Sequence, residues 1–146
     1  IDGETFDFKK LKGKKVLIVN VASYCGYTGQ YKGLQELHEK FGDKLIILGF
    51  PCNQFGMQEP GSNQKIKEFC SSKFHVTFTM MDKCDVKGKD QHPIYQWLTR
   101  SDLNGIENSE VSWNFNKYLI DELGKYIQHF SSKIEPMDEA IISKLK

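Results

Sequence analysis

The stretches that decide the fold are VLIVNVA, residues 16–22, and LIILGF, residues 45–50. Both are almost continuously apolar and rich in β-branched or branched side chains, which is typical of strands buried on both faces of a sheet. Between them, apolar side chains recur at helical spacing over residues 30–41. A strand, a crossover helix and a second strand form a βαβ unit, so we expect a parallel strand pair with a right-handed crossover.

The rest of the chain supplies further strands and helices. Segments 113–120 and 125–130 flank a turn that contains Gly124, which predicts an antiparallel hairpin. Residues 76–86 alternate weakly between apolar and polar side chains. Three more segments have helical patterns: residues 63–72, 92–100 and 137–145. A βαβ unit at the start and a hairpin followed by a helix at the end predict an α/β, thioredoxin-like fold, with a mixed sheet flanked by helices.

Length and charge exclude several classes of function. The 146 residues are enough for one domain, expected over residues 1–146. A net charge of +1 gives no broad basic field, so we expect no nucleic-acid partner. No apolar run approaches the roughly 18 residues of a membrane helix, so we expect no stable membrane insertion. The chain begins at Ile1 rather than Met, which indicates truncation or processing, and we expect a cytoplasmic protein.

The four cysteines do not form a recognisable framework. They are Cys25, Cys52, Cys70 and Cys84, too few for a disulfide-rich scaffold. No CxxC motif is present, which argues against a zinc site, and we expect no bound metal. A catalytic thiol, a resolving thiol and a buried structural cysteine all remain open on this evidence.

Of the four cysteines, Cys25 has the position most typical of a catalytic thiol. It follows the first predicted strand and precedes the first predicted helix, where α/β folds gather reactive groups and where the helix dipole favours a thiolate. The alternative is a cysteine that packs as a small hydrophobe, but the neighbours in residues 23–28 are typical of a loop. Thr28 stands where a CxxC motif would place its second cysteine, which predicts a single nucleophile whose oxidised form is resolved elsewhere.

Three blocks of sequence carry a resemblance to a known family. They are NVASYCGYT at 20–28, FPCNQFG at 50–56 with QEPGS at 58–62, and SWNFNKYL at 112–119. In this order they resemble the signatures of the glutathione peroxidase family, and the likeness runs from about Gly13 to the C-terminus. The resemblance implies a hydroperoxide reductase on a thioredoxin-like fold that needs no metal, haem, flavin or other cofactor.

The family's catalytic tetrad carries over, through these blocks, to Cys25, Gln54, Trp113 and Asn114. Side-chain amides and an indole N–H are neutral donors, so they favour a thiolate without supplying a rival nucleophile. They also stabilise negative charge on the departing peroxide oxygen, as an oxyanion hole does. Taken alone, Trp113 reads as a core aromatic residue and Gln54 as a polar loop residue. Only the shared pattern assigns them to a site.

The expected cycle begins when the Cys25 thiolate attacks a peroxide oxygen and becomes a sulfenic acid, which then condenses with a second thiol. The resemblance to the two-Cys, thioredoxin-dependent branch assigns that thiol to Cys70, although Cys70 is also compatible with simple packing beside Phe69. We expect its helix to unwind locally, because disulfide formation needs close approach of the two Cα atoms. Cys52 and Cys84 are expected to be structural, Cys84 as a buried strand residue.

The resemblance also predicts the oligomeric state, the substrates and the reductant. Tetrameric members carry a longer insertion between the positions of Leu98 and Trp113, so the short segment here predicts a monomer with an open site that admits lipid hydroperoxides. Because the nucleophile is Cys rather than Sec, thioredoxin is the expected reductant, and glutathione in a one-Cys cycle is the alternative. Two other functions remain open: a redox relay that passes a disulfide to a client protein, and a non-enzymatic binding module.

Overall fold

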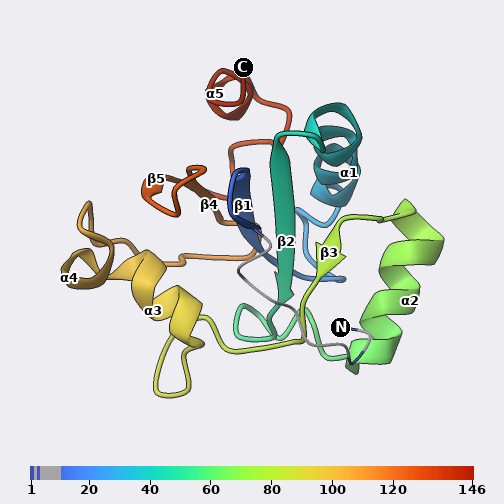
Figure 1. Ribbon diagram of the computed structural model, residues 1–146. Helices are drawn as coiled ribbons and strands as arrows, with labels where there is room; N and C mark the ends of the chain where they lie inside the picture. The colour runs from blue at the N-terminus through green and yellow to red at the C-terminus, as the bar shows by residue number, and fades with distance from the viewer. Residues whose placement is uncertain (2, 4–10) are drawn as a thin grey trace.

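A five-stranded mixed sheet forms the centre of the molecule (Figure 1). The computed structural model describes residues 1, 3 and 11–146. The order across the sheet is β3-β2-β1-β4-β5, with β1, β2 and β3 parallel and β4 antiparallel to both β1 and β5. The strands are β1 (Lys15–Val21), β2 (Leu45–Pro51), β3 (Thr79–Met80), β4 (Lys117–Ile120) and β5 (Tyr126–Phe130). The predicted parallel pair and the predicted hairpin are both confirmed.

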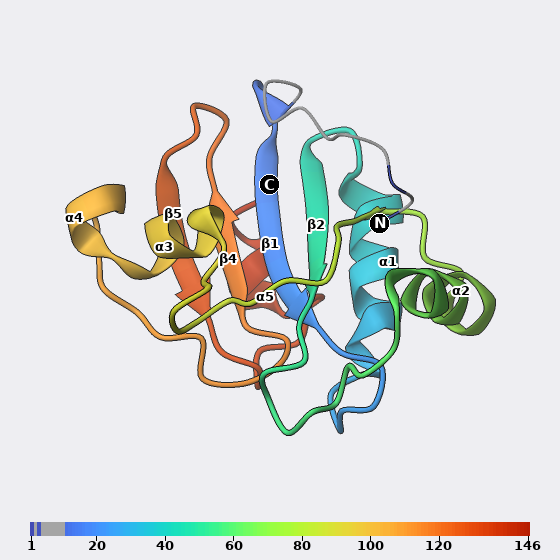
Figure 2. The same cartoon turned by 90° about the horizontal axis from the view of Figure 1, so that it is seen from below.

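Helices lie on both sides of this sheet (Figures 1 and 2). They are α1 (Gln30–Phe41), α2 (Asn63–Phe74), α3 (Pro93–Thr99), α4 (Ser101–Asn104) and α5 (Glu139–Ile142). Alternate residues of β1 serve two apolar clusters: Leu17 and Val19 pack with α1, α2 and α5, whereas Val16 and Ile18 pack with α3. Because side chains alternate along a strand, this double burial explains why β1 is apolar almost throughout and confirms the expected fold class.

Three elements differ from the sequence expectation. Residues 113–116 form a turn instead of the start of a strand, because Phe115 has a left-handed backbone with φ of 61° and the ladder begins only at Lys117. In the 76–86 segment, only Thr79 and Met80 pair with β2. The last helix is limited to residues 139–142. In each case, an amphipathic or alternating pattern extends beyond the residues that make regular hydrogen bonds.

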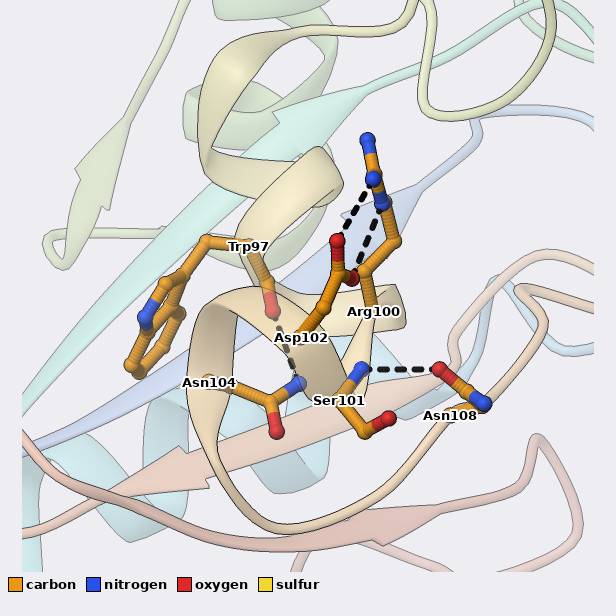
Figure 3. Close-up of polar contacts among 6 residues, drawn as sticks. All are labelled: Trp97, Arg100, Ser101, Asp102, Asn104 and Asn108. Atoms are coloured by element: carbon orange, nitrogen blue, oxygen red, sulfur yellow. Dashed lines mark hydrogen bonds and ion pairs between the residues drawn. The ribbon is translucent and has the colours of Figure 1, made fainter.

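The short helix α4 has no counterpart in the sequence expectation, and Figure 3 shows the contacts that support it. The Asn108 side chain accepts a 2.7 Å hydrogen bond from the Ser101 backbone N–H, and the Asn104 amide donates to the Trp97 carbonyl at 2.8 Å. The Arg100 guanidinium also pairs with Asp102 at 2.7 Å. These local side-chain bonds, rather than hydrophobic periodicity, stabilise the turn.

Candidate active site

Cys25 lies in the loop between β1 and α1 and is half-buried. Its backbone N–H donates to the Thr28 hydroxyl at 2.9 Å, and that hydroxyl donates to the Ala22 carbonyl at 2.8 Å. The Thr28 N–H returns to the Cys25 carbonyl at 3.0 Å. Thr28, which stands where a CxxC motif would have its second cysteine, therefore fixes the conformation of the loop around the single thiol.

The sulfur of Cys25 accepts a hydrogen bond from the backbone N–H of Tyr27, with N and Sγ 3.4 Å apart. A donor aimed at sulfur stabilises negative charge there. The other three thiols lie in less favourable surroundings, since burial raises the pKa of Cys52, that of Cys70 to about 11 and that of Cys84 to about 12. Cys25 thus combines solvent access with a donor to sulfur.

The two cysteines expected to be structural have different environments. Cys52 is fully buried in the cluster beneath α3, next to Gln54. Cys84 is only partly buried and lies beyond β3 in a segment without strand pairing. The expectation of a strand position for Cys84 is therefore wrong, because the ladder with β2 ends at Met80.

The turn that carries Trp113 and Asn114 is fixed by Asn20 of β1. The Asn20 amide donates to the Trp113 carbonyl at 2.9 Å, and the Asn20 carbonyl accepts from the Phe115 N–H at 2.6 Å. Asn116 reinforces the turn by donating its side-chain amide to the same Trp113 carbonyl at 2.9 Å. Asn20 is the one polar residue within the apolar run of β1, and its role is to hold this turn.

Ser132 connects the same turn to the helix behind Cys25. Its hydroxyl donates to the Asn114 carbonyl and accepts from the Asn116 amide at 3.1 Å. Its carbonyl accepts a 2.7 Å hydrogen bond from the side chain of Gln30, the first residue of α1. Because these residues are almost fully buried, the network links the turn and the N-terminus of α1 without water between them.

Two glutamines of the second block have different surroundings. The Asn114 amide donates to Oε1 of Gln58 at 3.0 Å, and the Gln58 carbonyl accepts from the Tyr24 N–H at 3.0 Å. Gln58 thus contacts both the Asn114 turn and the residue next to Cys25. Gln54 instead accepts from the Val86 N–H at 2.7 Å and donates to the Lys87 carbonyl at 2.8 Å.

The structure therefore brings Gln58, rather than the expected Gln54, together with Asn114 and the Cys25 loop. Sequence reasoning missed Gln58 although it lies in the same block. Two glutamines four residues apart are equivalent by type, and only the contacts of their amides separate them.

Trp113 packs over the loop that follows β2. Its ring makes an edge contact with Phe55, with centroids 5.8 Å apart. Gly56 has φ of 66°, and a Cβ there would lie 3.1 Å from the indole, so a side chain at this position would press on Trp113. The indole is half-buried against the loop that also carries Gln58.

Cys70 lies on α2 with 2% of its surface exposed. Cys25 packs against the same apolar cluster, so both thiols border one region of the core. Near the end of α2, Ser72 bonds back to the Glu68 carbonyl at 2.6 Å, and left-handed His75 caps the helix with its N–H on the Cys70 carbonyl. Serine back-bonding competes with the helix ladder, and a left-handed backbone is strained for a residue other than glycine.

The described part of the chain contains no group of three or more His, Cys, Asp or Glu side chains that could hold a metal ion. Among the same residues, no helix is both long and apolar enough to cross a membrane. The reactive groups that this site brings together are the Cys25 thiol, with a backbone donor to its sulfur, and the amide pair of Gln58 and Asn114.

Comparisons with known proteins agree with a site built around a reactive thiol. A family model described as glutathione peroxidase matches residues 1–99. The "Glutathione peroxidase-like peroxiredoxin 2" of Saccharomyces cerevisiae is 51% identical, with 98% of this chain and 90% of that protein covered. The "Hydroperoxy fatty acid reductase gpx1" of Synechocystis is 43% identical, with 93% and 84% covered.

Solved structures give the same result for the fold. The crystal structure of T. cruzi GPX1 has a TM-score of 0.71 at 33% identity, covering 98% of this chain and 86% of that one. A thioredoxin-family thiol:disulfide interchange protein from Chlorobium tepidum has a TM-score of 0.64 at 14% identity, covering 99% and 85%. These likenesses confirm the thioredoxin-like fold.

Proposed function

Because this chain belongs to the glutathione peroxidase family, we propose that it reduces hydrogen peroxide and organic hydroperoxides in a two-Cys cycle recycled by thioredoxin. Cys25 is the peroxidatic nucleophile and Cys70 the resolving thiol. The observation that carries the proposal is the surroundings of Cys25: a half-buried thiol with a backbone donor to its sulfur, in a loop bonded to the Gln58–Asn114 amide pair.

In the first step, the Cys25 thiolate attacks one peroxide oxygen and the O–O bond breaks. The sulfur becomes a sulfenic acid, and the other oxygen leaves with a proton as water or an alcohol. Asn114 occupies Oε1 of Gln58, so the N–H₂ of Gln58 remains available as a donor. Together with the indole N–H of Trp113, it would stabilise charge on sulfur and on the departing oxygen. Gln58 takes the role first expected of Gln54.

In the second step, the Cys70 sulfur attacks Cys25 Sγ and displaces hydroxide, which leaves as water once protonated. Burial of Cys70 on α2 requires the helix to open first, and its serine-rich end supports that opening. The resulting disulfide would be reduced by exchange with a dithiol protein such as thioredoxin. Thiols that become exposed by local opening suit such a partner.

Residues 1–146 are proposed to form a single peroxidase domain that works as a monomer in the cytoplasm. The short segment between Leu98 and Trp113 supports an open site, and Tyr24 and Met57 expose 69% and 75% of their surface beside it. An apolar rim of this kind would accept acyl chains, in keeping with the name of the Synechocystis relative. Lipid hydroperoxides are therefore proposed as substrates alongside hydrogen peroxide.

A coupled assay with thioredoxin, thioredoxin reductase and NADPH tests this proposal. We expect peroxide-dependent NADPH consumption that is abolished in Cys25→Ser and retained in Cys84→Ser, the matched control. Turnover with glutathione but not with thioredoxin would assign the one-Cys cycle instead. No turnover with either reductant, together with a mixed disulfide to a client protein, would favour the redox relay.

A further inference from the structure

Several buried polar atoms have no hydrogen-bond partner among the described residues. Three of them belong to segments that meet beside the Cys25 loop: Oδ1 of Asn114 and both carboxyl oxygens of Glu59. Native proteins leave few such groups unsatisfied, and each one needs an explanation. Glu59 is the most unusual of them, because it is ionisable and the peroxidase cycle described above does not use it.

Glu59 has 0% of its surface exposed. Its backbone is fixed, since its N–H donates to Asn53 at 2.9 Å and its carbonyl accepts from Lys83 Nζ at 3.3 Å. Lys83 thus binds the backbone of this residue and of Gly61 instead of neutralising the carboxyl group. A buried carboxylate with no ion pair among the described residues is costly, so the Glu59 carboxylate is a better proton acceptor than an exposed one.

Groups from several segments act on the Glu59 carboxyl. Burial raises its pKa above the ordinary value, and Ser23 of the Cys25 loop and Lys83 offset only part of this rise. Tyr24 donates its N–H to the carbonyl of Gln58, the residue before Glu59, and the rings of Tyr24 and Tyr31 both lie 6.4 Å from the ring of Phe69, the residue before Cys70. Burial raises the pKa of Tyr31 and of Cys70, and the Glu59 charge adds to the rise of both. The Tyr31 hydroxyl adjoins the Cys70 thiol. Glu59 therefore shares one buried region with the resolving thiol and with the loop of the peroxidatic thiol.

We propose, on the basis of the two-Cys cycle above, that Glu59 accepts the thiol proton of Cys70 when the Cys25 sulfenic acid is resolved. The proton leaves Cys70 for the carboxylate through the Tyr31 hydroxyl. The Cys70 thiolate attacks Cys25 Sγ, the new S–S bond forms and the S–O bond breaks. The departing hydroxide receives the proton back from Glu59 as water, so the carboxylate is regenerated and no other reactant is consumed.

This assignment has a structural consequence for α2. A thiolate is disfavoured in apolar surroundings, and Cys70 lies among the apolar side chains of the core. Transfer of its proton to Glu59 would therefore favour movement of Cys70 out of the core and toward Cys25. Proton transfer and opening of the helix would then be coupled events.

The test uses Glu59→Gln, with the exposed Glu68→Gln on α2 as matched control. Stopped-flow measurements separate Cys25 oxidation from disulfide formation. In Glu59→Gln we expect Cys25 oxidation within about twofold of wild type, and disulfide formation about 10²-fold slower at neutral pH. The slow rate should recover as pH rises, because solvent hydroxide then replaces the internal base. Glu68→Gln should match wild type in both steps.

Two further measurements separate proton transfer from a structural role. Infrared difference spectra of wild type during disulfide formation should show a transient carboxylic acid band that is missing in Glu59→Gln. Glu59→Asp should restore part of the rate. Disulfide formation in Glu59→Gln at the wild-type rate, or equal loss of both steps, would overturn the assignment. Failure of wild type itself to form a Cys25–Cys70 disulfide would instead refute the two-Cys cycle.

Discussion

The side-chain amide of Asn114 donates a 3.0 Å hydrogen bond to Oε1 of Gln58. This bond joins the turn after residue 112 to the loop after β2, two segments that are far apart in the sequence. It also sets the orientation of the Gln58 amide, because an occupied Oε1 leaves the N–H₂ group as the free end. The donor role proposed for Gln58 depends on this orientation.

The first prediction concerns the two glutamines. Gln58→Glu keeps an acceptor for Asn114 and removes the donor, so the rate of Cys25 oxidation by peroxide should fall by about 10²–10³. Gln54→Ala should leave that rate nearly unchanged and lower the free energy of unfolding by about 1–3 kcal/mol, since it leaves the backbone N–H of Val86 without its partner. Stopped-flow oxidation and urea unfolding measure the two effects. A large loss of the oxidation rate in Gln54→Ala, with little change in Gln58→Glu, would return the donor role to Gln54.

The second prediction concerns Asn20, which supports the Trp113 turn. Asn20→Asp keeps the acceptor for the Asn116 N–H and replaces the donor to the Trp113 carbonyl with an oxygen. We expect a loss of about 1–3 kcal/mol in the free energy of unfolding. The loss should be smaller at low pH, where a protonated Asp again donates. Urea unfolding at two pH values measures both effects, with the exposed Asn108→Asp as control. An equal loss of stability in the two variants would contradict the prediction.

The third prediction concerns the resolving thiol. Cys70→Ser should keep the rate of Cys25 oxidation and accumulate the sulfenic acid, because only the second step is removed. Thioredoxin-dependent turnover should be lost, and Cys25 should become over-oxidised with excess peroxide. Trapping with a sulfenic-acid reagent and mass spectrometry measures this. Cys52→Ser is the matched buried control, and full thioredoxin-dependent turnover in Cys70→Ser would contradict the assignment.

The fourth prediction follows from Lys117, which is fully buried and donates to the Ile134 carbonyl. Burial lowers its pKa from 10.5 to about 8. In the unfolded chain the proton is retained to higher pH, so between these values the unfolded state binds more protons and stability rises with pH. The difference in the free energy of unfolding between wild type and Lys117→Met should therefore shift toward wild type across this range. A difference in the free energy of unfolding that stays constant across this pH range would contradict a lowered pKa for Lys117.

The fold could be predicted in outline because its strongest signals are local. The apolar runs of β1 and β2 and the helix between them encode the parallel pair directly. The turn at residues 113–116 could not be read as a turn, because it depends on Asn20, which lies more than ninety residues earlier. The short helix α4 depends on side-chain caps that have no periodicity.

The site could be predicted in part for a related reason. Cys25 is marked by its place between a strand and a helix, and the Trp113 and Asn114 pair by a specific block. The choice between Gln54 and Gln58 depends on which amide reaches Asn114, and this contact bridges segments that the sequence does not relate. The burial of Glu59 could not be predicted either, since a glutamate in a polar loop gives no sign of being buried.

The two-Cys cycle is best tested by peptide mapping without reduction, after one equivalent of hydrogen peroxide. We predict a Cys25–Cys70 disulfide, with Cys52 and Cys84 still present as free thiols. An unmodified Cys25 would contradict the peroxidase cycle, and an oxidised Cys25 beside a free Cys70 would contradict the two-Cys mechanism.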